Sequence, residues 1–569
     1  MTPRPRRLDQ PLVAVLEKRG RFLVAEPLFG RGPRPAVEQR GAGAGDLVLV
    51  GSGKRSARVI RNLGRPDRAR DVLEGLMLDR GLHRNYARSA GAEAEHAAGE
   101  PYAAGDRVDL TALPTFTIDP DDARDFDDAI SATREDGRIR VWVHIADVTA
   151  FVRPGGPLDG EAYRRGTSVY VPGTVEPMLP EVLSNRVCSL RPGEEKLGVT
   201  VEMEMDGAEV RSVVFHRSRV RSDARLAYGQ VDDIFAGRAR AEEPWATPLE
   251  AAREVSAALR ARRESLELGS AEPVFDFDSE GHVTGLRYEE QTESHSLIEQ
   301  LMILANEQVA GYLADHRLPT LYRVHERPEP TAVGFLAEQF ASLDVPTPPL
   351  PRHMTPQQAA DLSAEMSRIV AREAGGRRAL GILVLRSLKQ AYYSPRNLGH
   401  AGLGSARYCH FTSPIRRFPD VIAHRALLQG LGIDHGALRT HELPEAGVAT
   451  SAAERSAMQI ERAADDICLA FLLERVLSEA DPVEPPAFEG EVMGLIEKGA
   501  FIRFGEQGFE GFLPSRRLRG WWTLNDLGTA LEAEGSGRQL RLGDSVSVLV
   551  DRVETARGRV DLSPAGAYS

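Results

Sequence analysis

The sequence lacks any long apolar run. No stretch of about 18 uncharged apolar residues, the length that a membrane-spanning helix needs, occurs in its 569 residues. Near the N-terminus, the apolar residues 12–16 run directly into Glu17, Lys18 and Arg19. That stretch is too short for a secretion signal and has no small-residue cleavage site. We therefore expect a cytoplasmic protein that is not inserted in a membrane.

Cysteine is almost absent as well. The chain has three cysteines, Cys188, Cys409 and Cys468, and they are far apart in the sequence. This pattern excludes a disulfide framework and a cysteine-rich zinc site. We expect all three to be buried or partly buried thiols.

An excess of positive charge is also missing, because the formal net charge is −12. For a protein that binds a polyanion, the distribution of charge matters more than its sum. Residues 1–88 contain nineteen Lys and Arg against nine Asp and Glu, a local net charge of +10 that leaves −22 for the rest. This basic segment fits either a solvated face or a nucleic-acid contact, and its composition does not decide between them.

The chain is too long for one hydrophobic core, so we expect three or four domains. Short strand patterns at 21–25, 46–50 and 57–60, separated by Gly- and Pro-rich turns, predict a small N-terminal β-barrel. The Pro-rich segment 481–486 predicts a linker before a second small β domain. The strand candidates of that domain are 488–496, 499–504, 511–513, 545–553 and 559–562.

Between these ends the pattern mixes strands and helices, so the predicted fold class is multidomain α+β. The alternation in 139–145 predicts a strand. Residues 294–317 predict a helix with a capping box of Ser296 and Glu299, and 451–479 predict a long amphipathic helix. The expected boundaries are 1–66 for the N-terminal barrel, 67–112 for a helical segment and an Ala/Gly/Glu-rich linker, 113–432 for the mixed domain, 433–480 for a helical extension and 487–565 for the C-terminal barrel.

The most informative segment is acidic. Six aspartates fall within ten positions: Asp119, Asp121, Asp122, Asp125, Asp127 and Asp128. So many like charges repel one another unless a cation neutralises them, and hard carboxylate oxygens suit Mg²⁺ or Mn²⁺. The alternative is an acidic surface loop, although the segment lies directly ahead of an apolar strand. A calcium-binding EF-hand is excluded because Arg124 stands where that loop needs glycine and Ile130 where it needs glutamate.

The same segment resembles the signature of the ribonuclease II/R family, the RNB domain. The family pattern, Ile-Asp with Asp-x-Asp-Asp beginning six positions later, is matched at Asp119, Asp125, Asp127 and Asp128. Similar blocks follow in the family's order at 167–173 with 177–180, 183–190, 294–306, 321–326 and 410–425. One such block would be weak evidence, whereas the ordered series is specific.

The resemblance implies a processive 3′-to-5′ exoribonuclease that acts on single-stranded RNA, releases nucleoside 5′-monophosphates and serves RNA decay or 3′-end processing. It implies a mixed α/β RNB catalytic domain flanked by oligonucleotide-binding (OB-fold) barrels, cold-shock-like before it and S1-like after it. In that plan Asp119, Asp125 and Asp128 hold Mg²⁺, with Mn²⁺ as the alternative, and Asp127 serves the chemical step. Arg416 stabilises the transition state, with an ordinary surface arginine as the alternative interpretation.

The resemblance also implies RNA contacts. Tyr170 matches the residue that stacks on the 3′ end, although a core tyrosine is the alternative. In the S1-like domain Phe501 is the stacking candidate, whereas Phe504 and Phe512 fit the core. Arg417 is the local rival of Arg416 and a further candidate RNA contact. Three more arginines fit either phosphate contacts or a solvated loop: Arg516, Arg517 and Arg519.

The expected partner is single-stranded RNA, and the expected state is a monomer. One alternative is an RNA-binding protein on an inactive nuclease scaffold, which the presence of all four matched aspartates and Arg416 argues against. Another is a DNA nuclease with similar metal chemistry. The sequence departs from the family in having room for one clear N-terminal barrel, where relatives often carry two, and in lacking the Lys-rich tail of some members. The handling of duplex RNA is therefore left open.

Overall fold

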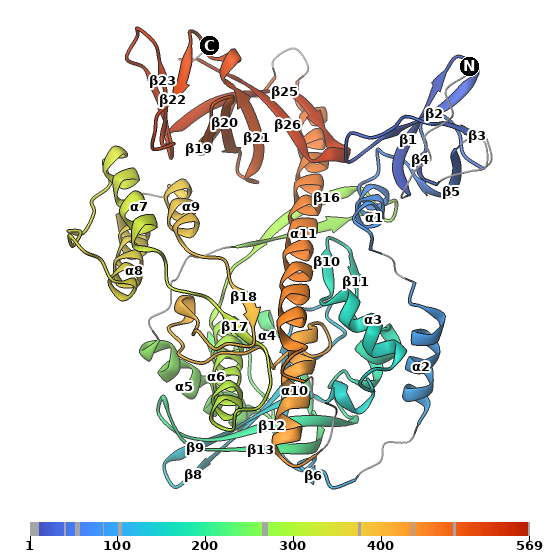
Figure 1. Ribbon diagram of the computed structural model, residues 1–569, viewed down its shortest axis with the longest axis vertical. Coiled ribbons are helices and arrows are strands. Elements are labelled where there is room, and N and C mark those ends of the chain that lie inside the picture. Colours follow the sequence, from blue (N-terminus) through green and yellow to red (C-terminus); the bar gives the residue numbers. More distant parts are fainter. Residues whose placement is uncertain are drawn as a thin grey trace.

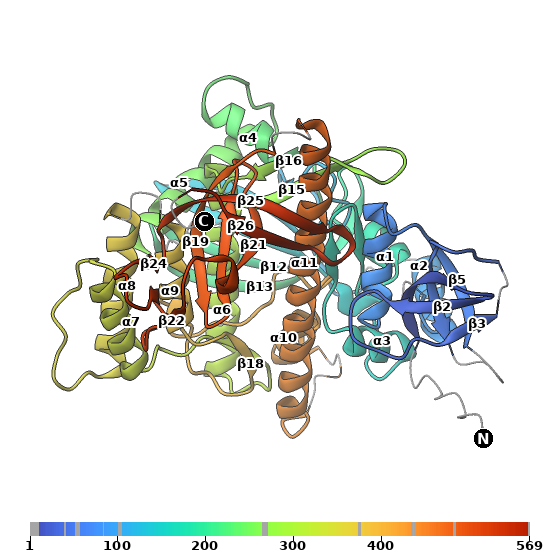
Figure 2. The ribbon, with the colours of Figure 1, turned by 90° about the horizontal axis from the view of Figure 1, so that it is seen from above.

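A long helix, α11 (Leu443–Glu479), connects the parts of this computed structural model. It runs from the central domain to the two terminal barrels, which lie on either side of it (Figure 1) and keep this arrangement when seen from above (Figure 2). The structure describes residues 11–38, 41–51, 57–82, 85–100, 105–263, 271–373, 377–433, 436, 439–481 and 485–566. In the described ranges no helix is long and apolar enough to cross a membrane.

The N-terminal segment forms one closed five-stranded barrel, as predicted. Its strand order is β1-β2-β3-β5-β4, and its inward side chains include Ala14, Leu16, Val48 and Val50. The strands are β1 (Leu12–Arg19), β2 (Phe22–Pro27), β3 (Ala36–Glu38), β4 (Leu47–Gly51) and β5 (Ala57–Gly64). Helix α1 (Ala69–Asp79) follows and packs between this barrel and α11.

The Ala/Gly/Glu-rich stretch was predicted to be a linker, and this prediction is wrong for most of its length. Residues Arg88–Gly99 form helix α2. Alanine and glutamate are strong helix formers, and the helix is held by tertiary contacts. It packs on α3 (Pro157–Arg165), where Glu93 Oε2 accepts a 2.9 Å hydrogen bond from the backbone N–H of Leu158.

The central domain is built on a seven-stranded sheet of order β14-β7-β8-β9-β12-β13-β6. Its apolar residues pack with those of helices α5 (Ala246–Arg262), α6 (Glu293–Asp315) and α10 (Phe418–Gly430) in one core. The strands are β6 (Val108–Asp109), β7 (Phe116–Asp119), β8 (Asp128–Glu135), β9 (Arg138–Ala146), β12 (Glu195–Asp206), β13 (Glu209–Arg221) and β14 (Ala224–Ala227).

Smaller elements surround this sheet. The hairpins and strand pairs are β10 (Val169–Val171) with β11 (Thr174–Glu176), β15 (Glu272–Phe277) with β16 (Val283–Glu289), and β17 (Tyr322–Val324) with β18 (Tyr392–Ser394). The further helices are α4 (Tyr228–Phe235), α7 (Pro330–Ser342), α8 (Pro356–Glu373) and α9 (Arg378–Ser387). Short helical turns lie at Val148–Ala150, Val182–Val187, Ala401–Leu403, Ser515–Arg517 and Thr555–Arg557.

Helix α6 was predicted to within one residue at its start but with the wrong capping box, and the start of α11 was predicted wrongly. Helix α6 begins at Glu293, with a capping box of Thr292 and His295 rather than Ser296 and Glu299. Thr292 and His295 are three positions apart, so they satisfy the free N–H groups of the first turn. Helix α11 begins at Leu443, eight residues before the predicted start, with a proline in its first turn.

The C-terminal domain is a second closed barrel, of order β19-β20-β21-β26-β25. Its strands are β19 (Phe488–Ile496), β20 (Gly499–Phe504), β21 (Phe509–Pro514), β25 (Ser545–Glu554) and β26 (Arg559–Pro564), close to the predicted ranges. A separate three-stranded sheet that the sequence did not predict is inserted between β21 and β25. It consists of β22 (Trp522–Leu524), β23 (Ala530–Ala533) and β24 (Gln539–Arg541).

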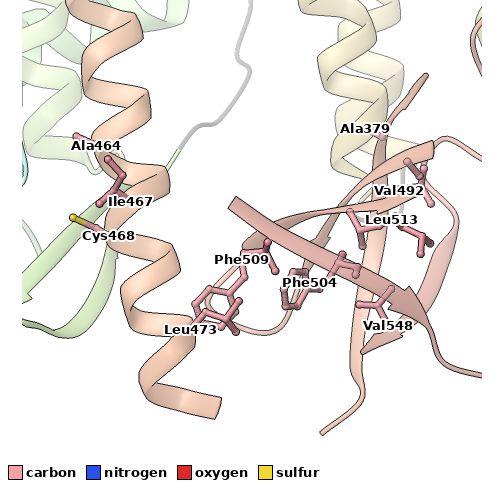
Figure 3. Close-up of a cluster of buried hydrophobic side chains, with 14 of the residues drawn as sticks. Ala379, Ala464, Ile467, Cys468, Leu473, Val492, Phe504, Phe509, Leu513 and Val548 are labelled. Carbon is pink, nitrogen blue, oxygen red and sulfur yellow. The ribbon is translucent and has the colours of Figure 1, made fainter. Parts of the chain in front are cut away.

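Helix α11 and the C-terminal barrel share one hydrophobic core. Figure 3 shows Leu473 of α11 beside Phe509, with Phe504 in the same buried cluster. The approach is close: a Cβ added to Gly558 would lie 2.8 Å from the backbone carbonyl carbon of Asp466. Arg557 also reaches the other barrel, donating a 2.7 Å hydrogen bond to the carbonyl of Leu28. Cys188, Cys409 and Cys468 are all buried and free, as expected.

Candidate active site

The acidic segment connects two neighbouring strands of the central sheet. Asp119 is the last residue of β7 and Asp128 the first of β8, and the two strands pair antiparallel. The hairpin therefore brings both carboxylates to the same end of the sheet. Asp121 and Asp122 lie on the exposed part of the loop between them.

The loop is fixed to the domain rather than free in solvent. The backbone N–H of Phe126 donates a 3.0 Å hydrogen bond to Ser189 Oγ, and that hydroxyl donates a 2.8 Å bond to the carbonyl of Arg124. The Phe126 ring is buried. An unattached acidic surface loop, the alternative interpretation, does not fit these contacts.

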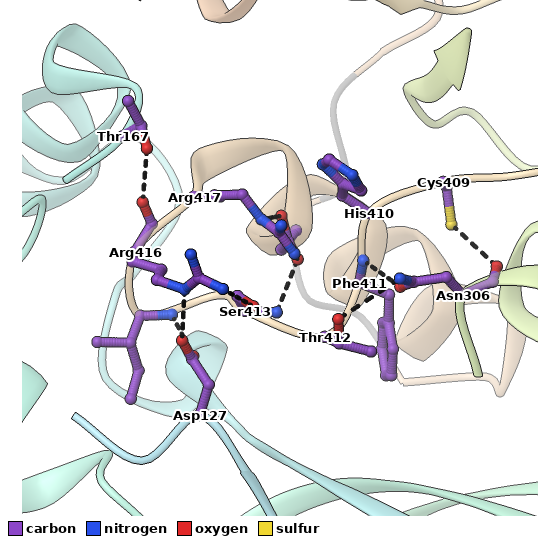
Figure 4. Close-up of polar contacts among 12 residues, drawn as sticks. Asp127, Thr167, Asn306, Cys409, His410, Phe411, Thr412, Ser413, Arg416 and Arg417 are labelled. Carbon is purple, nitrogen blue, oxygen red and sulfur yellow. Dashed lines mark hydrogen bonds and ion pairs between the residues drawn. The ribbon is translucent and has the colours of Figure 1, made fainter. Parts of the chain in front are cut away.

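Asp127 joins this loop to a segment far along the chain. Its Oδ1 accepts a 2.9 Å hydrogen bond from the backbone N–H of Ile415, and its Oδ2 lies 3.6 Å from Nε of Arg416. Figure 4 shows both contacts. Asp127 is 5% exposed. Burial raises its pKa well above the usual range, while Arg416 and the Ile415 N–H oppose that shift.

The guanidinium of Arg416 is held from several sides but is not enclosed. Its Nη2 donates a 3.2 Å hydrogen bond to Ser413 Oγ. The backbone carbonyl of Arg416 accepts hydrogen bonds from Thr167 Oγ1 and from the backbone N–H of Ser168. The side chain is 44% exposed. An oriented, accessible guanidinium can approach a phosphoryl group.

Arg417 has a different environment. Its Nε and Nη2 both bind the buried carboxylate of Asp420, at 2.9 and 2.8 Å. Asp420 Oδ1 also accepts a 2.7 Å bond from the backbone N–H of Ser413. This pair therefore fixes the turn that carries Arg416 (Figure 4).

Asp119 and Asp128 are electrostatically coupled. Burial is the main cause that raises the pKa of Asp128 to about 7, and the charge of Asp119 raises it further. Burial likewise raises the pKa of Asp119 to about 6, with a further contribution from Asp125. These shifts express first the cost of burying the two carboxylates and second the repulsion from their acidic neighbours.

The donor set fits a divalent cation. Asp119 Oδ2 is buried and has no hydrogen-bond partner within the described residues, and a cation would satisfy it. Across the same ranges, no group of three His, Cys, Asp or Glu side chains meets in a way that could already hold a metal ion. The fit therefore rests on the chemistry of these oxygens and on their mutual repulsion.

Tyr170 lies beside this site and is not a core residue. It is the central residue of β10 and is 39% exposed. Its hydroxyl donates a 3.3 Å hydrogen bond to Asp125 Oδ2. Its backbone N–H donates a 2.9 Å bond to Glu461 Oε1 on α11.

The structure adds residues that the sequence did not single out. Tyr228 begins α4 and stacks on His295, with 3.8 Å between ring centroids. Burial raises its pKa, and the nearby charges of Asp128 and Asp119 add to the shift. It reaches the site because β14, which precedes it, pairs parallel with β7. Glu461 is the other addition, since it holds the strand of Tyr170.

Phe501 lies on the C-terminal barrel, outside the cluster of aspartates and Arg416. It belongs to β20, is 48% exposed, and its ring centroid is 5.2 Å from that of Phe512 on β21. Phe504 is buried in the barrel core, as predicted, whereas Phe512 is only partly buried. Phe501 is therefore the more accessible ring of the pair.

Comparisons with known proteins agree with this architecture. Residues 107–432 match the model of the RNB domain, and residues 486–564 match that of the S1 RNA binding domain. The chain is 35% identical to Ribonuclease R of Escherichia coli over 482 residues, covering 80% of this chain and 57% of that protein. It is 33% identical to Ribonuclease R of Thermotoga maritima, covering 80% of this chain and 64% of that one. The chain thus spans less than two thirds of these relatives.

Solved structures with the same fold include "Mycoplasma genitalium RNase R in complex with ribose methylated single-stranded RNA", with a TM-score of 0.85 at 23% identity. That match covers 98% of this chain and 89% of the other. Yeast Ssd1, described as a pseudonuclease, has a TM-score of 0.68 at 16% identity, over 93% of this chain and 68% of that one. From the RNB match and the identity to Ribonuclease R, we conclude that the chain belongs to the ribonuclease II/R family of RNB-domain proteins.

Proposed function

We propose that the chain is a metal-dependent 3′-to-5′ exoribonuclease that digests single-stranded RNA processively to nucleoside 5′-monophosphates, in RNA decay or 3′-end processing. The observation that carries this proposal is the convergence of Asp127 and Arg416 beside the coupled carboxylates of Asp119 and Asp128. Buried carboxylates with raised pKa values beside an accessible guanidinium, here Asp127 and Asp128 with Arg416, are typical of functional sites.

In this proposal Asp119, Asp125 and Asp128 hold Mg²⁺, with Mn²⁺ as the alternative. The cation would polarise the scissile phosphodiester and help to deprotonate the attacking water. The protein's own part begins with the loop contacts through Ser189, which keep the carboxylates in place without RNA. Burial first, and repulsion between the carboxylates second, disfavours the charged forms of Asp119 and Asp128 and raises the pKa of both. A bound cation would offset both costs by neutralising the carboxylates.

Arg416 and Asp127 act on the phosphate. The Arg416 fork would bind the phosphoryl oxygens and stabilise the charge that develops on them. Asp127 sets the direction of that fork through the 3.6 Å contact and fixes the backbone at Ile415. Because Arg417 is bound to Asp420, we assign the phosphate contact to Arg416, and the RNA contact of Arg417 stays a prediction.

The ring of Tyr170 would stack on the 3′-terminal base, and Phe501 would stack on a base further upstream. Stacking tolerates every base, which suits an enzyme that digests any sequence. Structures of the Mycoplasma genitalium relative contain single-stranded and double-stranded RNA. We propose single-stranded RNA as the partner of this chain, acting as a monomer in the cytoplasm.

A side-by-side digestion tests the proposal. The chain is incubated with 5′-labelled RNA and DNA strands of one sequence, with Mg²⁺ or with EDTA. We expect a ladder shortening from the 3′ end of the RNA, and no product from DNA or in EDTA. Equal cleavage of both strands would indicate a DNA nuclease. Binding without cleavage would indicate an inactive scaffold, the state that the description of Ssd1 names for the same fold.

A further inference from the structure

Trp521 is the one tryptophan of this chain that faces solvent. It is 71% exposed, whereas Trp142, Trp245 and Trp522 are 6–7% exposed, and the sequence contains four tryptophans. An indole is a large apolar group that is usually buried or placed in an interface. A single exposed side chain needs no explanation by itself, so the surroundings of Trp521 decide its meaning.

Hydrogen bonds hold the loop that carries Trp521. The carbonyl of Arg519 accepts a 3.3 Å hydrogen bond from Trp522 Nε1 and a 2.7 Å bond from Arg538 Nη2. The carbonyl of Trp521 accepts a 2.9 Å bond from the backbone N–H of Glu534. Gly520 has φ +103°, which a residue with a side chain rarely adopts. The turn therefore buries Trp522 in the inserted sheet and keeps the neighbouring indole outside.

Exposed arginines precede Trp521 in this segment, and Glu534, whose backbone N–H binds the Trp521 carbonyl, is an exposed acid beside it. Arg516 and Arg519 are exposed, and neither has a carboxylate partner in the part of the chain that the structure describes. Arg517, between them, binds Asp551 at 3.0 Å. An exposed indole in a short segment that also carries two guanidiniums without carboxylate partners among the described residues matches single-stranded RNA, whose bases stack while its phosphates need cations. An apolar protein partner would find two charges to desolvate there.

Trp521 is also within reach of the aromatic face of the barrel. Phe512 pairs in register with Phe501, and nine residues of chain lead from Phe512 to Trp521, which span at most about 30 Å. One OB-type barrel occupies roughly 4–16 nucleotides of a single strand. A single RNA strand is therefore long enough to contact both places.

We infer that Trp521, with Arg516 and Arg519, forms a second stacking site for single-stranded RNA, in the segment that leads from β21 into β22 and separate from the face of β20 and β21. It rests on the proposal that the chain binds RNA. The site adds contacts to the upstream part of the RNA without contacting the reacting phosphate.

The intrinsic fluorescence of Trp521 gives a direct test. The full chain is titrated with oligo(A) of 30 nucleotides in EDTA, which keeps the RNA intact, while fluorescence anisotropy of labelled RNA measures total binding. We expect RNA to quench solvent-exposed emission and to protect it from acrylamide. Trp521→Phe should lose that signal but keep its affinity, because the ring still stacks. Trp521→Ala should weaken binding by roughly 5- to 150-fold, the equivalent of one stacked base.

The outcomes separate the two proposals. Two outcomes would overturn the second site and leave RNA binding intact. One is normal anisotropy without quenching in the unchanged chain. The other is quenching in the unchanged chain together with an unchanged affinity of Trp521→Ala. No binding in anisotropy would overturn the proposed function itself. Phe335→Ala is the matched control, because Phe335 is an exposed aromatic on α7, and it should bind as the unchanged chain does. Arg519→Glu should weaken binding as Trp521→Ala does, and an unchanged affinity would exclude its charge from the site.

Discussion

Asp127 and Arg416 are 289 residues apart in sequence, yet Oδ2 of Asp127 lies 3.6 Å from Nε of Arg416. The carboxylate is buried and the guanidinium is partly exposed. Asp127 therefore positions the guanidinium of Arg416, which can still contact an incoming phosphate. This relationship makes different predictions for the two partners.

Asp127→Asn should abolish most of the hydrolysis while RNA binding persists or tightens. The amide oxygen can still accept the N–H of Ile415, so the fold is kept, but the negative charge facing Arg416 and the RNA phosphate is lost. We expect kcat to fall by about 100-fold or more, measured on a short 5′-labelled oligomer.

Asp121→Asn is the matched control, because Asp121 is an exposed acid of the same loop. It should cleave at the normal rate. Near-normal turnover of Asp127→Asn would show that Asp127 has no part in the chemical step.

Arg416→Lys should lower kcat and leave KM nearly unchanged. Lysine keeps the charge but not the planar fork, so the loss should be on the order of 100- to 1000-fold in kcat, typical of one lost transition-state donor. Steady-state kinetics on a short oligomer measure it. A change confined to KM would instead make Arg416 a binding residue.

Arg417→Lys offers a contrast. It breaks the two-point contact with Asp420, so its main effect should be a lower melting temperature. A normal melting temperature with a large loss of kcat would transfer the catalytic role from Arg416 to Arg417.

Local patterns predicted the C-terminal barrel well, because alternating apolar residues report strands directly. Strands β19 and β20 have the predicted bounds. The inserted sheet β22–β24 was missed because its strands are short and tertiary contacts hold it. One example is the 2.9 Å bond from Gln339 Nε2 to the carbonyl of Leu527. Helix α2 was missed because its composition also fits a linker.

The candidate site was predictable to the extent that its residues are adjacent in sequence. The aspartates stand in one segment, and their repulsion points to a cation. The contact of Asp127 with Ile415 spans 288 residues, and that of Tyr170 with Glu461 spans 291. Tyr228 enters through the pairing of β14 with β7. No local pattern encodes such contacts.

Phe501→Ala should weaken the binding of long RNA by about 1–3 kcal/mol, the value of one stacked base. Turnover of short oligomers should not change, because Phe501 lies on the barrel. Removing the whole domain is a poorer test, since Leu473 of α11 packs in its core. Filter binding at several salt concentrations gives the affinity, with Phe335→Ala as the control. Equal RNA affinities of Phe501→Ala and Phe335→Ala would show that Phe501 does not contact the RNA.

His144 should make the fold sensitive to acid. Its Nε2 and Nδ1 contact Ser131 and Thr200 within the sheet, at 3.0 and 2.9 Å. Burial lowers its pKa to about 3, with a smaller effect of His216. Below about pH 6.5 the His144 side chain is therefore protonated in the unfolded chain but not in the folded one. The free energy of unfolding falls as the pH falls, by about 2 kcal/mol at pH 5 relative to neutral pH.

Urea unfolding at pH 8 and pH 5 measures this effect, with His144→Gln as the comparison. Because glutamine does not titrate, only the unchanged chain loses this stability in acid. Its advantage over His144→Gln in free energy of unfolding should therefore be about 2 kcal/mol smaller at pH 5 than at pH 8. Parallel pH profiles would show that His144 does not contribute. The other buried histidines are common to both chains and cancel.

Tyr170 combines an accessible ring with a hydroxyl bound to Asp125 at 3.3 Å. The two parts can be separated by substitution. As an RNA shortens, contacts with the barrels are lost first, and the last nucleotides are held by the pocket alone. Stacking then supplies roughly 1–3 kcal/mol per base, so its loss affects short intermediates more than long ones.

Tyr170→Ala should therefore leave early cleavage of a long poly(A) nearly unchanged but release short intermediates sooner, so that the limit products become longer. Tyr170→Phe should give the same limit products as the unchanged chain, because the ring does the stacking. A gel of end products from 5′-labelled poly(A) resolves the three chains. Longer products from Tyr170→Phe as well would assign the effect to the hydroxyl and its contact with Asp125. Identical products from all three would make Tyr170 a packing residue.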